Sequence, residues 1–235
     1  MNELEAVFWD IGGVILDLTS VRRAHRAFVR DLCARHDLGV DEETAIERWQ
    51  SAVGDHFRAR EGTEFRAARE AYGVGVEVLV GEPLEATDWR PRFREVVEET
   101  IEPVEGAPAA IETLAGRDLH VGVISDVDDA EGRAMLEHFG VARHLDSITT
   151  SEAVGRTKPD PVIFETALDT AGVVPGRSAM VGDRYEHDVA GAAAVGMQTI
   201  AFGADAGPAV DYRIEEPREV VAIVDGDRSR FVEEA

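Results

Sequence analysis

AVFWDIGGVI, residues 6–15, places an aspartate between two apolar runs. A short apolar run that ends in turn-forming residues predicts a strand buried on both faces of a parallel sheet. Asp10 falls at the carboxyl end of this strand, and that end of an open α/β sheet faces the crevice where ligands bind. Gly12 and Gly13 let the backbone turn tightly and approach a ligand. We therefore expect a carboxylate at the mouth of a site; the alternative is that Asp10 only caps a turn.

From Pro103 onward, short apolar segments alternate with helical patterns. Strands are predicted at residues 119–124, 147–150, 178–181, 198–202 and 212–214, and helices at 108–115, 131–139, 160–171, 187–195 and 219–224. Such alternation predicts an α/β fold with a doubly wound parallel sheet and helices on both faces. The strand at residues 6–9 must join this sheet, because a lone buried strand is not stable.

The segment between these parts is mostly helical. Helices are predicted from a cap at Thr19 or Ser20 to before Gly39, over residues 41–60, over 61–72, and from a cap at Asp88 with Pro91 in the first turn through Ile101. Residues 73–85 are ambiguous. We expect an α/β catalytic core formed by residues 1–17 and 102–235, with a helical lid over residues 18–101 inserted between them.

Polar residues follow the predicted strands in a recognisable order: Asp10, then Ser125-Asp126, then Lys158 before Pro159-Asp160-Pro161, and then GDRYEHD at 182–188. This order and spacing resembles the haloacid dehalogenase-like (HAD) superfamily, whose members are mostly phosphatases. The resemblance covers the whole chain, and the helical insert resembles the superfamily's first type of cap. Lys158 is the only lysine in the sequence, which supports the match.

The resemblance implies an Mg²⁺-dependent hydrolase of small phosphomonoesters. Asp10 would attack phosphorus and form an aspartyl-phosphate, which splits the hydrolysis into two steps. Mg²⁺ prefers hard oxygen ligands, and Asp10, Asp183 and the Gly12 carbonyl would bind it, while Asp188 would hold a metal-bound water or Lys158.

Substrate contacts are also implied by the resemblance. Lys158 would contact both Asp10 and the phosphoryl group, and the Ser125 hydroxyl would donate to a phosphate oxygen. The backbone N–H groups of Ile11 and Asp126 would add further donors. The alternative is that Asp183 and Asp188 only form a turn and a helix cap.

Gly12 departs from the superfamily pattern. Its phosphatases usually carry an acid–base aspartate two residues after the nucleophile, and glycine cannot transfer a proton. A metal-bound water, His25 or His187 would then have to supply the proton, or the substrate has a good leaving group, such as a sugar 1-phosphate. Two alternatives stay open: a dehalogenase-like hydrolase, and a catalytically impaired phosphate-binding or regulatory protein. Asp183, Lys158 and Ser125 favour phosphate.

The 235-residue chain carries 47 acidic against 24 basic residues, a net charge of −23. A dispersed acidic surface with one lysine resembles proteins of salt-loving organisms, in which molar salt shortens the Debye length to about 3 Å. The same charge argues against nucleic acid as a partner, because phosphates would be repelled. We expect a small phosphorylated metabolite as the partner.

Other features set the expected location. No apolar run is long enough to span a membrane, and no signal peptide is recognisable. Cys33 is the only cysteine, so a cytoplasmic protein without intrachain disulfides is expected, as a monomer or a homodimer. Arg22, Arg23 and Arg26 can bind phosphate, but a solvated surface role is the preferred interpretation.

Overall fold

The computed structural model describes residues 3–205 and 207–232. The chain divides into two compact units, Met1–Asp17 with Pro103–Ala235, and Leu18–Glu102. Each unit has its own buried core. Among the described residues, no helix is both long and apolar enough to cross a membrane.

The larger unit is built on a parallel sheet. In the described part of the chain its strand order is β3-β2-β1-β4-β5-β6, with every pair parallel. The strands are β1 (Ala6–Trp9), β2 (His120–Ser125), β3 (Ser147–Thr150), β4 (Ser178–Gly182), β5 (Gln198–Phe202) and β6 (Tyr212–Ile214). β1 lies inside the sheet and all of its residues are buried, as its apolar sequence predicts. The predicted doubly wound α/β fold is confirmed.

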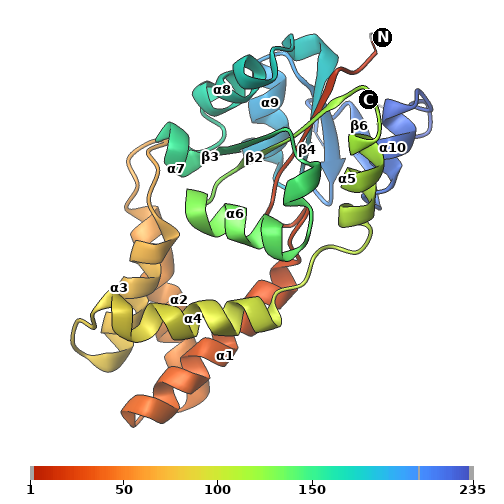
Figure 1. The fold of residues 1–235 in the computed structure, drawn as a ribbon. Coiled ribbons are helices and arrows are strands. Elements are labelled where there is room, and N and C mark those ends of the chain that lie inside the picture. The colour runs from red at the N-terminus through yellow and green to blue at the C-terminus, as the bar shows by residue number, and fades with distance from the viewer. Residues whose placement is uncertain (1–2, 206, 233–235) are drawn as a thin grey trace. The chain divides into compact units, whose positions relative to one another are not determined.

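Helices cover both faces of this sheet (Figure 1). They are α5 (Ala107–Ala115), α6 (Asp129–His138), α7 (Ser151–Val154), α8 (Pro161–Ala171), α9 (Ala190–Ala194) and α10 (Glu219–Val224), with short 3₁₀ turns at Ala142–His144 and Pro175–Arg177 and a π-helical turn at Tyr185–Val189. α8 and α9 pack on Phe8, Ile124 and Met180 of the central strands. This packing leaves the carboxyl ends of β1, β2 and β4 at one edge of the sheet.

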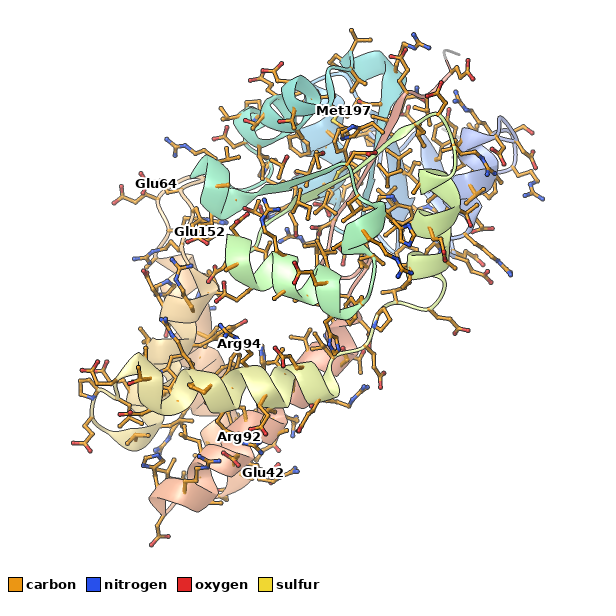
Figure 2. All side chains as sticks on the ribbon, in the orientation of Figure 1. Glu42, Glu64, Arg92, Arg94, Glu152 and Met197 are labelled. Carbon is orange, nitrogen blue, oxygen red and sulfur yellow. The ribbon has the colours of Figure 1, made fainter. Side chains whose placement is uncertain are left out.

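The smaller unit contains four helices: α1 (Leu18–His36), α2 (Glu42–Arg58), α3 (Ala68–Val80) and α4 (Ala86–Thr100). Its interior is aromatic, and Phe28, Trp49 and Trp89 are at most 4% exposed. Trp49 and Trp89 are thus core residues of this unit. Charged side chains, including the labelled Glu42, Arg92 and Arg94, project from its helices (Figure 2).

Two helix boundaries in this unit differ from the prediction. The helix predicted at residues 61–72 is wrong, because helix α3 begins only at Ala68 and runs through the segment that was ambiguous. The glycines made that segment difficult to interpret, yet Gly75 is needed there: a Cβ would lie 2.5 Å from the Trp49 ring. Helix α4 begins before Asp88, with Glu85 at the N-cap, so the predicted cap is also wrong.

The start of α1 differs too. The helix begins at Leu18, and Ser20 is not its cap; the Ser20 hydroxyl instead accepts a hydrogen bond from the Glu102 backbone N–H at 3.0 Å. The nearby arginines bind acceptors on their own unit. Arg22 donates to Thr19, Arg23 pairs with Glu102 at 2.8 Å, and Arg26 pairs with Glu43 at 3.4 Å, all at exposed positions. These contacts support the surface interpretation of the three arginines.

His25 lies among aromatic rings in this unit. Its ring centroid is 4.7 Å from that of Trp49, 5.3 Å from that of Tyr72 and 6.0 Å from that of Phe93. Burial lowers the pKa of His25 to about 4. The imidazole is therefore neutral at pH 7 and cannot supply a proton as an imidazolium, which argues against His25 as the proton source for the leaving group.

We predict that His25 makes stability pH-dependent. Because its pKa is about 4 in the folded chain and about 6.5 when unfolded, the unfolded state takes up the proton first as pH falls. The free energy of unfolding should then decrease between pH 6.5 and 4, by at most about 3 kcal/mol from this group. Urea unfolding at pH 7 and 4.5 should show a smaller decrease for His25→Phe than for His36→Phe, whose histidine is exposed. Equal decreases would contradict the prediction.

Candidate active site

The sheet register brings the predicted site residues to one edge. Trp9 at the end of β1 pairs with Val123 of β2 on one side and Val181 of β4 on the other. The Asp10 backbone N–H then donates to the Val181 carbonyl at 3.0 Å, which fixes Asp10 just beyond β1. Ser125 ends β2 and Asp183 follows β4 directly, so all three residues emerge at the carboxyl edge.

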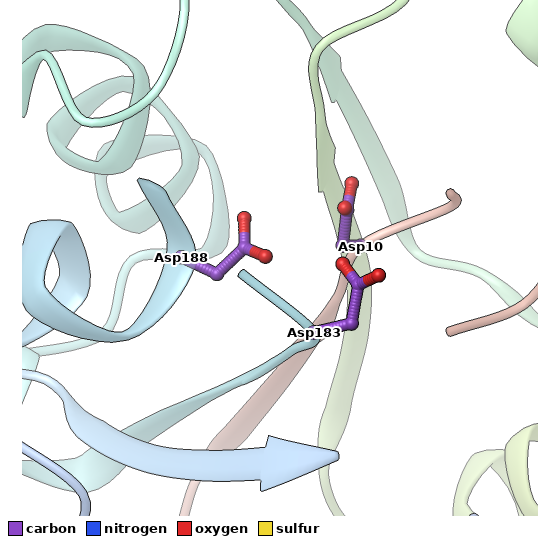
Figure 3. A group of neighbouring side chains, drawn as sticks. All are labelled: Asp10, Asp183 and Asp188. Atoms are coloured by element: carbon purple, nitrogen blue, oxygen red, sulfur yellow. The ribbon is translucent and has the colours of Figure 1, made fainter. Parts of the chain in front are cut away.

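Asp10, Asp183 and Asp188 form a compact acidic cluster. One carboxylate oxygen from each lies within 4.8 Å of the others, and Figure 3 shows the three carboxylates gathered beyond β1 and β4. Glycines make room for them. A Cβ at Gly13, whose φ is +79°, would lie 1.9 Å from Asp183 Oδ2, and a Cβ at Gly182 would lie 2.1 Å from Asp188 Cβ.

Lys158 supplies the positive charge of this cluster. Its side chain is fully buried, and Nζ lies 2.9 Å from Asp10 Oδ1 and 2.5 Å from Asp188 Oδ1. Nζ also donates to the Ile124 carbonyl at 3.1 Å. Burial alone would lower the pKa of Lys158, but the charges of Asp10, Asp188 and Asp126 outweigh it and raise the pKa. Lys158 is therefore an ammonium held between two carboxylates.

One ammonium does not neutralise three carboxylates, and the pKa values reflect this. Burial raises the pKa of Asp10, with the Lys158 charge opposing and the Asp188 charge adding to the rise. Burial, followed by the charges of Asp10 and Asp188, raises the pKa of Asp183 to about 6. Asp183 Oδ1 is also buried without a hydrogen-bond partner among the described residues. Clustered hard oxygens with excess negative charge are a donor set that fits a divalent cation such as Mg²⁺.

Asp126 connects several segments around this cluster. Its Oδ1 accepts hydrogen bonds from the Ser151 hydroxyl at 2.7 Å and the Lys158 backbone N–H at 2.8 Å. Its Oδ2 accepts from Arg184 Nη2 at 2.9 Å. Burial would raise the pKa of Asp126, but its hydrogen bonds and the Lys158 charge lower it well below the usual range. Asp126 thus joins the end of β2 to the start of α7, the Lys158 segment and the end of β4.

The sequence did not single out these roles. Asp126 was predicted to act through its backbone N–H, whereas the structure shows its carboxylate as an acceptor from Ser151, Lys158 and Arg184. The available signal was only that Arg184 stands inside the motif at 182–188. The turn carrying Asp188 begins at Tyr185, two residues before the predicted helix, and the Arg184 N–H donates to Asp188 Oδ2 at 2.9 Å.

The remaining predicted residues lie around the cluster with less specific contacts. Ser125 is 3% exposed at the end of β2, beside the strand that leads to Asp10. Gly12 is half-buried and forms an isolated bridge with Leu16. His187 Nδ1 lies 3.7 Å from Asp126 Oδ2, too far for a hydrogen bond. The structure therefore brings Asp10, Lys158, Asp183 and Asp188 into contact range, with Ser125 and Asp126 on the adjoining strand end.

Comparison with known proteins places this arrangement in a family. The family model described as "Hydrolase: haloacid dehalogenase-like hydrolase" matches residues 4–196. A haloacid dehalogenase-like hydrolase domain-containing protein 3 from Bos taurus is 42% identical over 43% of this chain, and the match spans 39% of that protein. A glyceraldehyde 3-phosphate phosphatase from Methanothermobacter thermautotrophicus is 25% identical over 94% of this chain and 96% of its own.

Solved structures share the fold. A HAD phosphatase from Thermococcus onnurineus superposes with a TM-score of 0.72 at 24% identity, covering 96% of this chain and 100% of that one. At this identity the likeness establishes the fold alone.

Replacing Lys158 tests whether the buried ammonium compensates the carboxylates. Lys158→Met removes the cation and leaves Asp10 and Asp188 buried together, which should lower the free energy of unfolding at pH 7 by about 3–5 kcal/mol. Arg117→Met is the matched control, since Arg117 pairs with Asp225 at an exposed position and should lose less than about 1 kcal/mol. Urea unfolding measures both. Equal losses in the two variants would show that Lys158 is not needed to hold the carboxylates.

Proposed function

Because the chain belongs to the haloacid dehalogenase-like hydrolase family, we propose that it is an Mg²⁺-dependent phosphatase of small phosphomonoesters. The observation that carries the proposal is the contact of Lys158 with Asp10 and Asp188 beside Asp183, at the carboxyl edge of the sheet. This arrangement offers a carboxylate nucleophile, a fixed cation and oxygen ligands for a metal ion. Phosphoryl transfer needs all three.

Each residue has a role in this proposal. The Asp10 carboxylate attacks phosphorus, the P–O bond to the leaving group breaks, and an aspartyl-phosphate forms on Asp10. A water molecule then attacks this phosphorus, which releases inorganic phosphate and restores the Asp10 carboxylate. Lys158 holds the carboxylate in place and offsets the charge of the approaching dianion, and the Ser125 hydroxyl donates to a phosphate oxygen.

The metal is a proposal on the same residues. Asp10 and Asp183 would bind Mg²⁺ together with the Gly12 carbonyl, with Asp188 holding Lys158 and a metal-bound water. The ion supplies charge neutralisation that lets an anionic nucleophile approach an anionic substrate. The buried Asp183 oxygen, which has no hydrogen-bond partner in the described part of the chain, supports this assignment.

Gly12 favours substrates with a good leaving group. Because residue 12 has no carboxylic acid, it cannot protonate the leaving oxygen. We propose small phosphorylated metabolites such as sugar 1-phosphates, whose leaving groups need less help. His187 remains a candidate proton donor, since it stands beside Asp126 at the rim of the acidic cluster.

Two other functions compete with this one. A dehalogenase-like hydrolase would use Asp10 on a carbon–halogen bond and would not need the metal. A phosphate-binding protein that lacks turnover would retain Lys158 and Ser125 and lack the acid–base group. The clustered acidic oxygens favour the phosphatase over the metal-independent dehalogenase, and relatives named as phosphatases support turnover.

The direct test is turnover. The protein should hydrolyse an aryl phosphate with Mg²⁺, lose activity with EDTA, and lose at least about 10³-fold with Asp10→Asn, because the nucleophile is gone. Asp225→Asn, on the surface, is the control. Trapping of a phosphorylated Asp10 with hydroxylamine would support the intermediate. Metal-independent halide release from a 2-haloacid would favour the dehalogenase, and tight phosphate binding without turnover on a broad panel would favour the non-catalytic protein.

Gly12→Asp should restore the missing acid–base group. The rate on alkyl phosphates with poor leaving groups should rise by about 100-fold, at the low end of general acid catalysis, while the rate on an activated aryl phosphate changes little. The measurement is kcat across phosphates of graded leaving-group pKa, with circular dichroism to confirm folding. A folded variant with an unchanged profile would contradict the proposed reason for the glycine.

A further inference from the structure

Lys158 is poorly placed to contact a substrate without giving up an existing partner. Its ammonium is fully buried and already faces Asp10 Oδ1, Asp188 Oδ1 and the Ile124 carbonyl. These are as many acceptors as an ammonium has N–H groups. A second cation of the protein with free N–H groups near Asp10 is therefore better placed than Lys158 to donate hydrogen bonds to the phosphoryl group.

Arg184 has the donors that Lys158 lacks. Its side chain is 45% exposed, and its guanidinium forms one described hydrogen bond, from Nη2 to Asp126 Oδ2. The rest of its planar fork of N–H groups is available, and this fork matches two phosphate oxygens at once. Its charge also opposes the rise that burial causes in the pKa values of Asp10 and Asp183, as expected for a cation near both.

The Arg184–Asp126 ion pair crosses the end of the strand that carries the nucleophile. Asp126 follows β2 and Arg184 lies two residues beyond β4, and β1 lies between these strands in the sheet. The Asp126 carboxylate is held on its other side by Ser151 and by the Lys158 backbone N–H. A guanidinium joined to this fixed carboxylate is kept at the same edge as Asp10.

Charge also favours a phosphate contact. Four carboxylates, from Asp10, Asp126, Asp183 and Asp188, face two cations, Lys158 and Arg184. A phosphomonoester dianion that enters this edge needs every accessible positive charge, and Arg184 is the half-exposed one of the two. A guanidinium bound to a dianion has a stronger partner than one bound to a single carboxylate.

We propose that Arg184 binds the phosphoryl group transferred to Asp10 through the N–H groups that Asp126 does not occupy, and that Asp126 is the positioning residue that holds Arg184 ready. The inference rests on the proposed phosphatase function, and it adds a substrate-binding residue and its positioning partner. No covalent bond is made or broken at Arg184; its hydrogen bond to Asp126 is kept and further hydrogen bonds to phosphate are added.

The experiment compares Arg184→Gln and Arg184→Lys with Arg117→Gln, which removes an exposed arginine–aspartate pair elsewhere in the same unit. Calorimetry with inorganic phosphate in the presence of Mg²⁺ measures binding, and steady-state hydrolysis of an aryl phosphate measures kcat and KM. Arg184→Gln should weaken phosphate binding and lower kcat/KM by about 10- to 100-fold, because charge-assisted hydrogen bonds are lost. Arg184→Lys should fall between, and Arg117→Gln should match the parent protein.

Asp126→Asn tests the positioning role. The amide can keep its oxygen toward Ser151 and Lys158, but its NH₂ group then faces Arg184 and cannot accept from it. The Asp126→Asn substitution should raise KM in the parent protein and change KM little in the Arg184→Gln background. A merely structural role of Asp126 would raise KM in both backgrounds.

The outcomes separate this inference from the proposed function. A parent protein that hydrolyses phosphates while Arg184→Gln binds phosphate and turns over like the parent would overturn the role of Arg184 alone. A parent protein without turnover, whose phosphate binding still depends on Arg184, would support the inference and overturn the phosphatase. Phosphate binding equally weakened in Arg117→Gln would show a general charge effect and would also overturn the inference.

Discussion

Two buried carboxylates, Asp10 and Asp188, paired with one buried ammonium beside the half-buried Asp183, are the constraint on which the site depends. Taking such charges out of water is costly, and the cost is offset only when opposite charges and hydrogen bonds surround them. Lys158 provides an opposite charge for Asp10 and Asp188, but the pKa values of Asp10 and Asp183 stay raised. Asp10, Asp183 and Asp188 each keep a buried oxygen that no described residue hydrogen-bonds. The excess negative charge fits a divalent cation. The carboxylates that carry this charge are also the residues to which the proposed chemistry is assigned.

The sheet makes this constraint possible. Because β2, β1 and β4 are parallel neighbours, their carboxyl ends deliver residues that are far apart in the chain to one edge. Gly13 and Gly182 allow the carboxylates to approach, since a side chain at either position would occupy the place of Asp183 or Asp188. Asp126 then ties three further segments to this edge through its own hydrogen bonds. The fold and the charge cluster are thus parts of one arrangement.

The sequence predicted the strands, with Asp10 and Asp183 at strand ends, because buried strands followed by polar residues leave a clear pattern. That Lys158 lies beside Asp10 was implied only by the resemblance to the haloacid dehalogenase-like superfamily, since Lys158 lies between α7 and α8 and follows no strand. The sequence placed a helix at residues 61–72 and left 73–85 ambiguous, whereas α3 covers Ala68–Val80. Gly73 and Gly75 disfavour a helix by propensity, and only the structure shows that the Trp49 ring occupies the space beside Gly75. The acceptor role of Asp126 was also hidden, since its partners Ser151 and Arg184 are distant in sequence and their meeting depends on side-chain directions. Ion pairing of this kind leaves no periodic signal. The inference of a salt-loving source rests on composition and stays a prediction.

The most direct test of the central claim is a crystal structure of the protein with Mg²⁺ and a phosphate analogue such as vanadate. The account predicts one ion bound by carboxylate oxygens of Asp10 and Asp183, with the analogue's central atom facing the other Asp10 oxygen. An analogue bound away from Asp10, or a metal ion that the Asp183 carboxylate does not coordinate, would contradict it.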